Sequence, residues 1–420
     1  MGLCEPDTDE VRTLAVVGLG YIGLPTAALF SQHLKVVGVD IDSARVSDIM
    51  SGKFNSKEPG LSRLIGESIS RGRLTVTTEL PAADAYIVAV PTPIGRDKKP
   101  ILDYVHNAVR SIASQLKGGE LIVIESTCPP RTTQGIVDFL ASSRSDLAIR
   151  NSTETHGVDL LIDVAYCPER ILPGNALREL RDNNRIIGGH TAKAAERARN
   201  LYRLICDGEV SVTDAATAEM AKLVENSFRD VNLAFANEVS IICEELGVDV
   251  WELIALANQH PRVNILTPGT GVGGHCIAVD PWFITDSVSN APLIETARNV
   301  NDSKPFWVAD RIQKYLDEND CRRVTLLGLT FKADIDDLRE SPALLVATRL
   351  IERNPSIYFT VVEPNVNGAE ILTASNVQFA SIENSVRQTD LVAVLVDHSA
   401  FKAIDWDSVT AEVLDFRGVR

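Results

Sequence analysis

The chain has 420 residues, of which 45% are hydrophobic, and its formal net charge is −16. This length exceeds what one compact core holds, so we expect two or three domains. The acidic balance argues against a nucleic-acid-binding protein, which needs a basic surface, although local cations can still bind an anionic small molecule. No apolar run reaches the roughly 18 residues of a membrane span, so neither nucleic acid nor membrane is an expected partner.

The first ten residues carry acidic side chains and no apolar stretch, so we expect no secretory signal. The seven cysteines are scattered and form no CxxC pair, so their spacing predicts no zinc or other metal site. Unpaired cysteines of this kind are typical of a reducing compartment, and we expect a cytoplasmic protein.

The first half of the chain alternates short apolar runs with helical segments. The runs that we expect to be strands are 12–18, 35–40, 85–90, 120–125, 164–169, 185–189 and 210–213. Alternation of strands and helices predicts a doubly wound parallel sheet within a first domain, 1–213. The polar, aperiodic segment 143–160 is expected to be a surface loop.

The middle of the chain reads as helical. Residues 214–246 contain neither proline nor glycine and predict one long helix, with Gly247 as its C-terminal glycine. Strand-like runs return further on, at 323–329, 358–363, 391–396 and 412–416. The predicted fold class is therefore α/β, with two Rossmann-like doubly wound domains joined by a central long-helix domain, 214–305, and with 306–420 as the second α/β domain.

Gly18, Gly20 and Gly23 form G-x-G-x-x-G between a predicted strand and a predicted helix. In this context glycines permit a tight turn and the approach of a pyrophosphate to the helix N-terminus. Asp40 ends the next strand, where a carboxylate binds ribose hydroxyls and repels a 2′-phosphate, so we expect NAD as cofactor. Arg45 lies nearby and weakens that preference. The alternative is a packing turn without a cofactor.

Two threonine-containing loops follow predicted parallel strands. Thr92 lies in VPTPI and Thr127 in ESTCPPRTT, and loops at the carboxyl ends of such strands build binding sites. Both threonines are candidates to line the cofactor channel. The alternative is that the prolines only make the loops rigid.

Lys222, Asn226 and Arg229 are spaced i, i+4 and i+7 on the long helix, so they share one side of it. Two cations flanking an amide suit an anionic or polyhydroxyl ligand. An ordinary solvated helix face is the alternative.

The stretch GTGVGGHCIAVDPWF, 269–283, surrounds Cys276 with glycines. Asp280 and Pro281 predict a helix start, with Asp280 as the N-cap and Pro281 in the first position. A thiolate near a helix N-terminus is a potential nucleophile, and the glycines would let a substrate approach it. The alternative is an inert cysteine in a flexible loop.

Five stretches then match one family: YCPERI, KLVENSFRDVN, HPRVNIL, GVGGHCIAVDPWF and GLTFKADIDDLRESP. Together they make the chain resemble the nucleotide-sugar 6-dehydrogenases, the UDP-glucose/UDP-mannose dehydrogenase family, from about residue 12 to about 416. His275 and Val279 depart from the UDP-glucose branch, which usually has serine and lysine there. The flanking motifs are instead similar to UDP-N-acetyl-D-mannosamine dehydrogenases.

This resemblance implies an NAD-dependent four-electron oxidation of a sugar C6 alcohol to a carboxylate, through a thiohemiacetal and a thioester on Cys276. It implies that Lys222 and Asn226 stabilise the alkoxide and oxyanion, that Asp280 and Thr127 hold the hydrolytic water, and that Glu169 is an acid/base. Residues expected at the cofactor are Gly18, Gly20, Tyr21, Ile22, Gly23, Asp40, Arg45, Thr92, Thr127 and Arg339. Residues expected at the nucleotide sugar are Arg170, Ile171, Lys222, Asn226, Arg229, His260, Arg262, Gly273, Phe331 and Lys332.

The resemblance also implies a homodimer or a dimer-based oligomer, joined through the long helix, with Arg262 as a candidate contact between subunits. UDP-glucose, UDP-GlcNAc and UDP-GalNAc remain alternative substrates. A two-electron hydroxyacid dehydrogenase without a catalytic thiol, and a non-catalytic NAD-binding protein, are the alternatives from other classes.

Overall fold

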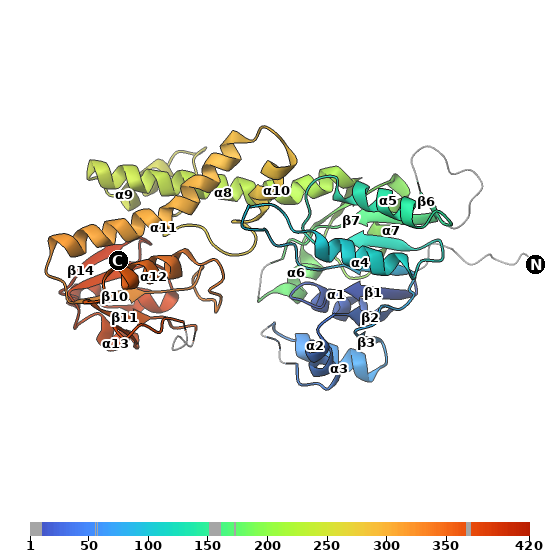
Figure 1. Cartoon of the computed structure of the whole chain (residues 1–420), viewed down its shortest axis with the longest axis horizontal. Coiled ribbons are helices and arrows are strands. Elements are labelled where there is room, and N and C mark those ends of the chain that lie inside the picture. Colours follow the sequence, from blue (N-terminus) through green and yellow to red (C-terminus); the bar gives the residue numbers. More distant parts are fainter. Residues whose placement is uncertain (1–10, 55, 57, 151–160, 172–173, 367–370) are drawn as a thin grey trace, which may run out of the picture. The chain divides into compact units, whose positions relative to one another are not determined.

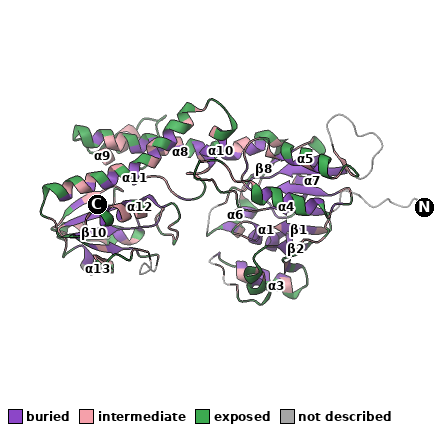
Figure 2. Ribbon diagram, in the orientation of Figure 1, coloured by how far each residue is buried: buried purple, intermediate pink, exposed green. Residues whose placement is uncertain are grey.

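The computed structural model describes residues 11–54, 56, 58–150, 161–171, 174–366 and 371–420 (Figure 1). The chain divides into two compact units, residues 1–224 and 225–420, and the boundary falls within the long helix α8 (Ala215–Leu246). Each unit has its own sheet and its own hydrophobic core. The central strands of both sheets are buried, whereas α8 exposes much of its surface (Figure 2).

The described part of the first unit contains a nine-stranded sheet. Its strands follow the order β3 (Leu74–Thr77), β2 (Lys35–Val39), β1 (Thr13–Val17), β4 (Ala85–Val88), β5 (Leu121–Ile124), β7 (Leu161–Tyr166), β8 (Arg185–Gly189) and β9 (Val210–Asp214), with β6 (Ala148–Ile149) beside β7. Every pairing is parallel except that between β7 and β8, which is antiparallel. The predicted parallel sheet is thus mixed at this one pair. The predicted loop 143–160 contains β6, and its residues 151–160 lie outside the described part.

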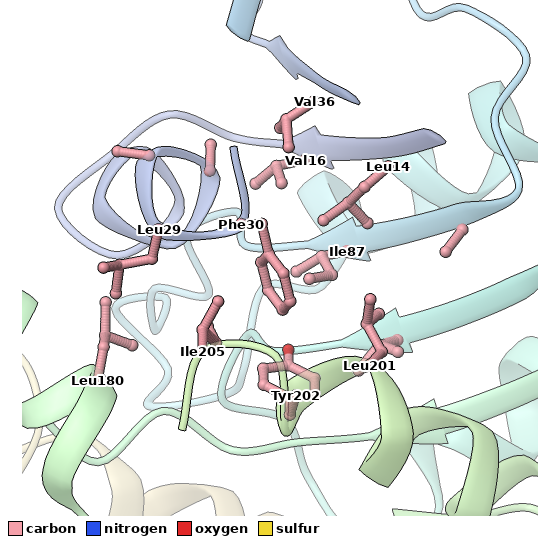
Figure 3. Close-up of a cluster of buried hydrophobic side chains, with 14 of the residues drawn as sticks. Leu14, Val16, Leu29, Phe30, Val36, Ile87, Leu180, Leu201, Tyr202 and Ile205 are labelled. Atoms are coloured by element: carbon pink, nitrogen blue, oxygen red, sulfur yellow. The ribbon is translucent and has the colours of Figure 1, made fainter. Parts of the chain in front are cut away.

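Helices cover both faces of this sheet. One face packs against α1 (Gly23–Phe30), α3 (Leu61–Ser70), α6 (Ala176–Asp182) and α7 (Ala192–Tyr202), and the other against α4 (Asp103–Ala113) and α5 (Thr132–Ser143), while α2 (Ser43–Met50) follows β2. In the first layer the rings of Phe30 and Tyr202 meet edge to face with centroids 5.6 Å apart (Figure 3). Strands covered on both faces must be apolar throughout, which explains the continuous runs in the sequence.

The second unit begins with the rest of α8, which ends before Gly247 as predicted; that glycine has a φ of +66°. The other helices are α9 (Val250–Ala257), α10 (Asp280–Ser287), α11 (Pro292–Glu318), α12 (Pro342–Arg353) and α13 (Ile382–Ser385), with 3₁₀ turns at Ser399–Ala403 and Trp406–Ser408. The parallel sheet has the order β12 (Val377–Phe379), β11 (Tyr358–Val362), β10 (Arg323–Leu327), β13 (Leu391–Val394) and β14 (Glu412–Asp415). Because α11 continues past residue 305, the three-domain division stays a prediction.

The two sheets repeat one local arrangement. Gly18 follows β1 and Gly328 follows β10; each has a positive φ and donates its N–H to the last residue of the neighbouring strand. The next backbone N–H is bound by Asp40 in the first sheet, at 2.9 Å, and by Glu363 in the second, at 2.7 Å. The second copy has a side chain, Thr330, where the first has its second glycine. Within the described residues, no helix is long and apolar enough to span a membrane.

Candidate active site

The glycine turn of the first unit has the geometry that a dinucleotide needs. Gly18 has a φ of +92°, and a β-carbon there would lie 2.4 Å from the carbonyl oxygen of Ala89. A β-carbon at Gly23 would lie 1.8 Å from the carbonyl oxygen of Gly18, whereas one at Gly20 would meet no atom within 4 Å. The outer glycines are therefore required by packing, and the middle one leaves open space at the N-terminus of α1. This is the cradle that a pyrophosphate would occupy, so these residues fit NAD.

Asp40 and Arg45 both contact the residue between these glycines. The Asp40 carboxylate accepts the N–H of Leu19 at 2.9 Å, and the Arg45 guanidinium donates to the Leu19 carbonyl at 2.8 Å. Asp40 thus lies at the end of β2, as predicted for a ribose-binding acid, and keeps a second oxygen that binds the N–H of Asp42. The hydrogen bond to Leu19 thus holds the Arg45 guanidinium against the glycine turn.

The loops carrying Thr92 and Thr127 are joined to each other. The Ser126 hydroxyl accepts the N–H of Val90 at 2.9 Å and lies 2.8 Å from its carbonyl oxygen, which connects the segments after β4 and β5. Both threonines are partly buried. Their contact with a cofactor remains a prediction.

Lys222 and Glu169 lie close enough within the first unit to interact electrostatically. Lys222 is 7% exposed and lies near the end of that unit on α8. Burial raises the pKa of Glu169, and the neighbouring Lys222 ammonium opposes that rise. The Glu169 carboxylate also accepts the N–H of Ile171, while Arg170 is exposed and donates to the Asn184 carbonyl at 3.3 Å. A buried cation beside a carboxyl group that holds its proton more tightly than usual suits proton transfer.

A buried acid beside this pair was not anticipated. Glu125, directly after β5, is 1% exposed and accepts the hydroxyl of Tyr202 at 3.2 Å. Its carboxylate lies 3.8 Å from the Arg185 guanidinium. Burial raises the pKa of Glu125 to about 7, Arg185 lowers it, and the nearby charge of Glu169 raises it further. Sequence spacing could not reveal this group, because Glu125 and Arg185 come from strands 60 residues apart.

Tyr21 makes a contact with Glu58 that the sequence did not predict. Its hydroxyl donates to Glu58 at 2.9 Å, and burial raises the pKa of the phenol, with the Glu58 carboxylate adding to the rise. Glu58 is 7% exposed and also accepts the backbone N–H groups of Gly174 and Ala176. Glu58 therefore connects the Tyr21 side chain of the glycine turn to the backbone at the start of α6.

In the second unit, Cys276 lies on the loop that precedes α10. It is the one exposed thiol among the cysteines that the structure describes. The Arg339 guanidinium is close enough to be affected by it: hydrogen bonding to Asp337 mainly raises the pKa of Arg339, and the Cys276 charge contributes. A neighbouring guanidinium stabilises a thiolate. His275, next in sequence, has its pKa lowered by burial and by Arg339.

The glycines around this loop have a packing function that the sequence analysis did not anticipate. A β-carbon at Gly273 would lie 2.3 Å from the carbonyl oxygen of Glu340, and one at Gly274, whose φ is +86°, 2.8 Å from the Phe331 ring. Gly269 and Gly271 are equally crowded, by Arg417 and by Pro305. The loop is thus held against the segment 331–342. Access for a substrate is not needed to explain these glycines.

Asp280 and Asn226 are brought together, but the predicted N-cap is wrong. Helix α10 starts at Asp280 itself, with Val279 as the N-cap residue and no side-chain cap. The N–H groups of Val279 and Asp280 both bind the Cys276 carbonyl, so a turn already precedes the helix. The Asp280 carboxylate is 3% exposed and accepts the Asn226 amide at 2.5 Å. Asn226 therefore orients the carboxylate of Asp280, which is not the N-cap residue of α10.

The remaining predicted substrate residues of the second unit are more open. Phe331 is partly buried, and those on the surface are Arg229, His260, Arg262 and Lys332. The His260 ring accepts the N–H of Arg262 at 3.3 Å. Their contacts with a nucleotide sugar remain predictions.

Comparison with known proteins adds the family context. Three models of the UDP-glucose/GDP-mannose dehydrogenase family match: its NAD binding domain over residues 12–206, its central domain over 216–303 and its UDP binding domain over 325–419. The second sugar nucleotide in the family's name is therefore GDP-mannose and not UDP-mannose, as the motifs had suggested.

Individual relatives are similar over nearly their whole length. The chain is 49% identical to an NDP-N-acetyl-D-galactosaminuronic acid dehydrogenase of Ralstonia nicotianae, over 98% of this chain and 96% of the relative. It is 48% identical to a UDP-N-acetyl-D-mannosamine dehydrogenase of Campylobacter jejuni, over 96% and 99%. A solved UDP-N-acetyl-mannosamine dehydrogenase from Staphylococcus aureus is 40% identical, with a TM-score of 0.84 over 97% of this chain and 95% of that one.

Proposed function

The chain belongs to the UDP-glucose/GDP-mannose dehydrogenase family and is an NAD-dependent UDP-sugar dehydrogenase, and on that premise we propose that it oxidises the C6 alcohol of UDP-N-acetyl-D-mannosamine to the uronate. The observation that carries the proposal is the exposed Cys276 thiol beside Arg339, with the Asp280–Asn226 pair in the same unit. A two-electron alcohol dehydrogenase needs no such thiol.

When bound, NAD accepts the hydride in each of the two oxidations. In the first, Lys222 stabilises the alkoxide, and Glu169 takes up the hydroxyl proton. The Cys276 thiolate then adds to the aldehyde carbon, because an aldehyde has no oxyanion to expel a second hydride.

Loss of the second hydride from the thiohemiacetal leaves a thioester on Cys276. Asp280 and Thr127 hold the water that attacks this thioester, and Asn226 orients the Asp280 carboxylate. The attack breaks the carbon–sulfur bond, releases the sugar carboxylate and regenerates the thiol. The raised pKa of Glu169 makes its carboxylate a stronger base than that of an ordinary glutamate.

The proposal includes a homodimer built on α8. Large apolar side chains recur at helical spacing on its surface: Phe228 (70% exposed), Phe235 (53%), Ile242 (47%) and Leu246 (71%). An apolar stripe of this length on a helix is typical of a subunit interface. The six described cysteines form no disulfide with one another, which favours a reducing compartment such as the cytoplasm.

The second candidate substrate is the N-acetyl-galactosamine epimer, because one relative of equal similarity is named for that uronate. The test is the number of NADH molecules formed per sugar with UDP-N-acetyl-D-mannosamine, UDP-N-acetyl-D-galactosamine and UDP-glucose. We expect two NADH per sugar and the highest kcat/KM with the mannosamine epimer. Higher kcat/KM for the galactosamine epimer would transfer the proposal to it.

The thiol step is tested by Cys276→Ser, with Cys321→Ser as the matched control, since Cys321 is partly buried before β10 and outside the proposed site. The Cys276→Ser enzyme should not complete the oxidation of the aldehyde to the sugar carboxylate. The Cys321→Ser enzyme should still form two NADH per sugar. Normal acid formation by Cys276→Ser would refute the thioester mechanism.

A further inference from the structure

A cavity of about 210 Å³ lies in the second unit among α8, α9, α11 and the end of β14. Its lining residues include Lys304, Trp251, Trp307 and Gly269. None of these residues has a part in the oxidation proposed above. A cavity of this size holds several water molecules or one small organic molecule.

Lys304 is the unusual member of this wall. It is 2% exposed, although lysine is seldom fully buried unless it is paired. Its Nζ donates to the Ser240 hydroxyl at 2.7 Å and lies 3.8 Å from the centroid of the Trp307 ring. Within the described residues, Ser240 is its one hydrogen-bond partner. An ammonium has three N–H donors, so its capacity is not used up by the protein.

The other charged groups of the cavity are already compensated. Glu244 on α8 forms an ion pair with Arg311 on α11. Asp415, at the end of β14, accepts the backbone N–H groups of residues 417–420. Buried polar groups are normally satisfied, so the unmet donors of Lys304 call for an acceptor from outside the chain.

We propose that this cavity binds a small monocarboxylate anion, which accepts hydrogen bonds from the Lys304 ammonium and lies against the tryptophan rings. A single negative charge fits best, because Lys304 is the one cation of the lining that lacks a carboxylate partner among the described residues. A ring face also stabilises the charged amine once it is protonated.

The bound anion would adjoin the loop that carries Cys276. The Ser240 hydroxyl, which holds Lys304, donates to the Asn237 carbonyl at 2.6 Å. The Asn237 side chain accepts the N–H of Gly269, the first glycine of that loop, at 2.9 Å. The cavity therefore shares a hydrogen-bonded frame with the start of the loop, and the proposal does not depend on which sugar the enzyme oxidises.

Proton uptake gives the proposal a specific signature. Burial lowers the pKa of Lys304 to about 7, and Glu244 opposes the shift. At pH 8 the amine is mostly neutral, so binding of a carboxylate must bring a proton with it: amine, proton and anion combine into an ion pair. The apparent Kd for the anion should consequently rise about tenfold between pH 8 and pH 9.

The experiment titrates the full-length protein with sodium acetate against sodium chloride at equal ionic strength, following tryptophan fluorescence. Calorimetry at pH 8 in two buffers of different ionisation enthalpy counts the protons. The variant is Lys304→Met, with Lys314→Met, exposed on the same helix, as the matched control. We expect a saturable response to acetate and uptake of nearly one proton in the wild type and in Lys314→Met, and neither in Lys304→Met.

Two results would overturn the proposal. One is a wild-type protein without a saturable acetate response, or with a response equal to that in chloride. The other is binding at pH 8 without proton uptake, which excludes Lys304 as the partner even if Lys304→Met does not fold. Neither measurement uses a sugar. The anion site can therefore be refuted while the dehydrogenase activity is confirmed, and the dehydrogenase activity can be refuted while the anion site is confirmed.

Discussion

Gly20 and Gly23 lie three positions apart, yet a methyl group added to each should have a different effect. At Gly23 it should lower stability, and at Gly20 it should weaken NAD binding. At Gly23 the new β-carbon would lie 1.8 Å from the Gly18 carbonyl oxygen and 3.3 Å from the Ala89 β-carbon. The oxygen must recede by about 1.2 Å to reach the 3.0 Å below which real β-carbons are not found. That oxygen belongs to a turn fixed by β1 and β2, so the backbone itself must move.

Overpacking of this kind costs about 1–3 kcal/mol and occasionally more. For a unit of this size each kcal/mol lowers the melting midpoint by about 2–4 °C, so Gly23→Ala should lose roughly 2–12 °C without any ligand. Gly20→Ala meets no atom within 4 Å and should leave that midpoint within about 2 °C. Its methyl group nevertheless stands where the pyrophosphate must approach, so it should weaken NAD binding at least tenfold, or about 1.4 kcal/mol.

The assay is thermal unfolding of both variants and the wild type, followed by the near-ultraviolet signal, with and without NAD. The wild-type midpoint should rise with NAD concentration, because the ligand binds only the folded state. Gly20→Ala should keep the wild-type midpoint without NAD and lose the rise. If Gly20→Ala melts as early as Gly23→Ala, or binds NAD like the wild type, the roles assigned to these glycines are wrong.

Three other substitutions test buried or exposed side chains. Glu125→Gln should gain stability over the wild type as pH rises from about 4.5 to about 7, by up to about 3 kcal/mol, because in this window the carboxyl of the unfolded chain ionises while the buried one keeps its proton; urea unfolding at pH 5 and 8 measures this, and an equal difference at both pH values would contradict it. Lys304→Met should lack the wild-type increase in stability between about pH 7 and 10, at most about 5 kcal/mol, since there the unfolded lysine binds the proton and the folded one does not; parallel pH curves for the two proteins would count against it. Phe228→Glu should shift the protein towards the monomer in sedimentation, whereas an unchanged mass would remove that face of α8 from the proposed interface.

The sequence was sufficient for the elements whose pattern is local. The apolar runs, the long helix with its terminal glycine and the spacing of Gly18, Gly20 and Gly23 all follow from short-range rules. The strands that were missed are β3, β6 and β12, which are short or lie at an edge and offer little apolar periodicity. Strand direction is not encoded in such runs either, so the antiparallel pairing of β7 with β8 was not foreseen.

The candidate site was predictable in its residue types but not in its contacts. Asp280 was assigned a capping role, because Asp-Pro is typical of helix starts, yet its carboxylate binds Asn226 on another helix. The Glu125–Arg185 pair and the amine of Lys304 depend on side chains that meet only in the fold. Contacts of this kind need the tertiary structure, since spacing along the chain contains no information about them.

A glycine turn follows both β1 and β10, and the difference between the two turns affects which nucleotide, NAD or UDP, each domain can bind. In the second copy, Thr330 and Ala333 hold the positions that Gly20 and Gly23 hold in the first. The Thr330 side chain is buried, and its hydroxyl donates to the Lys332 carbonyl at 2.8 Å. A dinucleotide pyrophosphate would find the position of Gly20 occupied by Thr330, so the second turn should discriminate against NAD. This one replacement would thus prevent the cofactor from competing for the UDP domain, even where NAD is present in large excess.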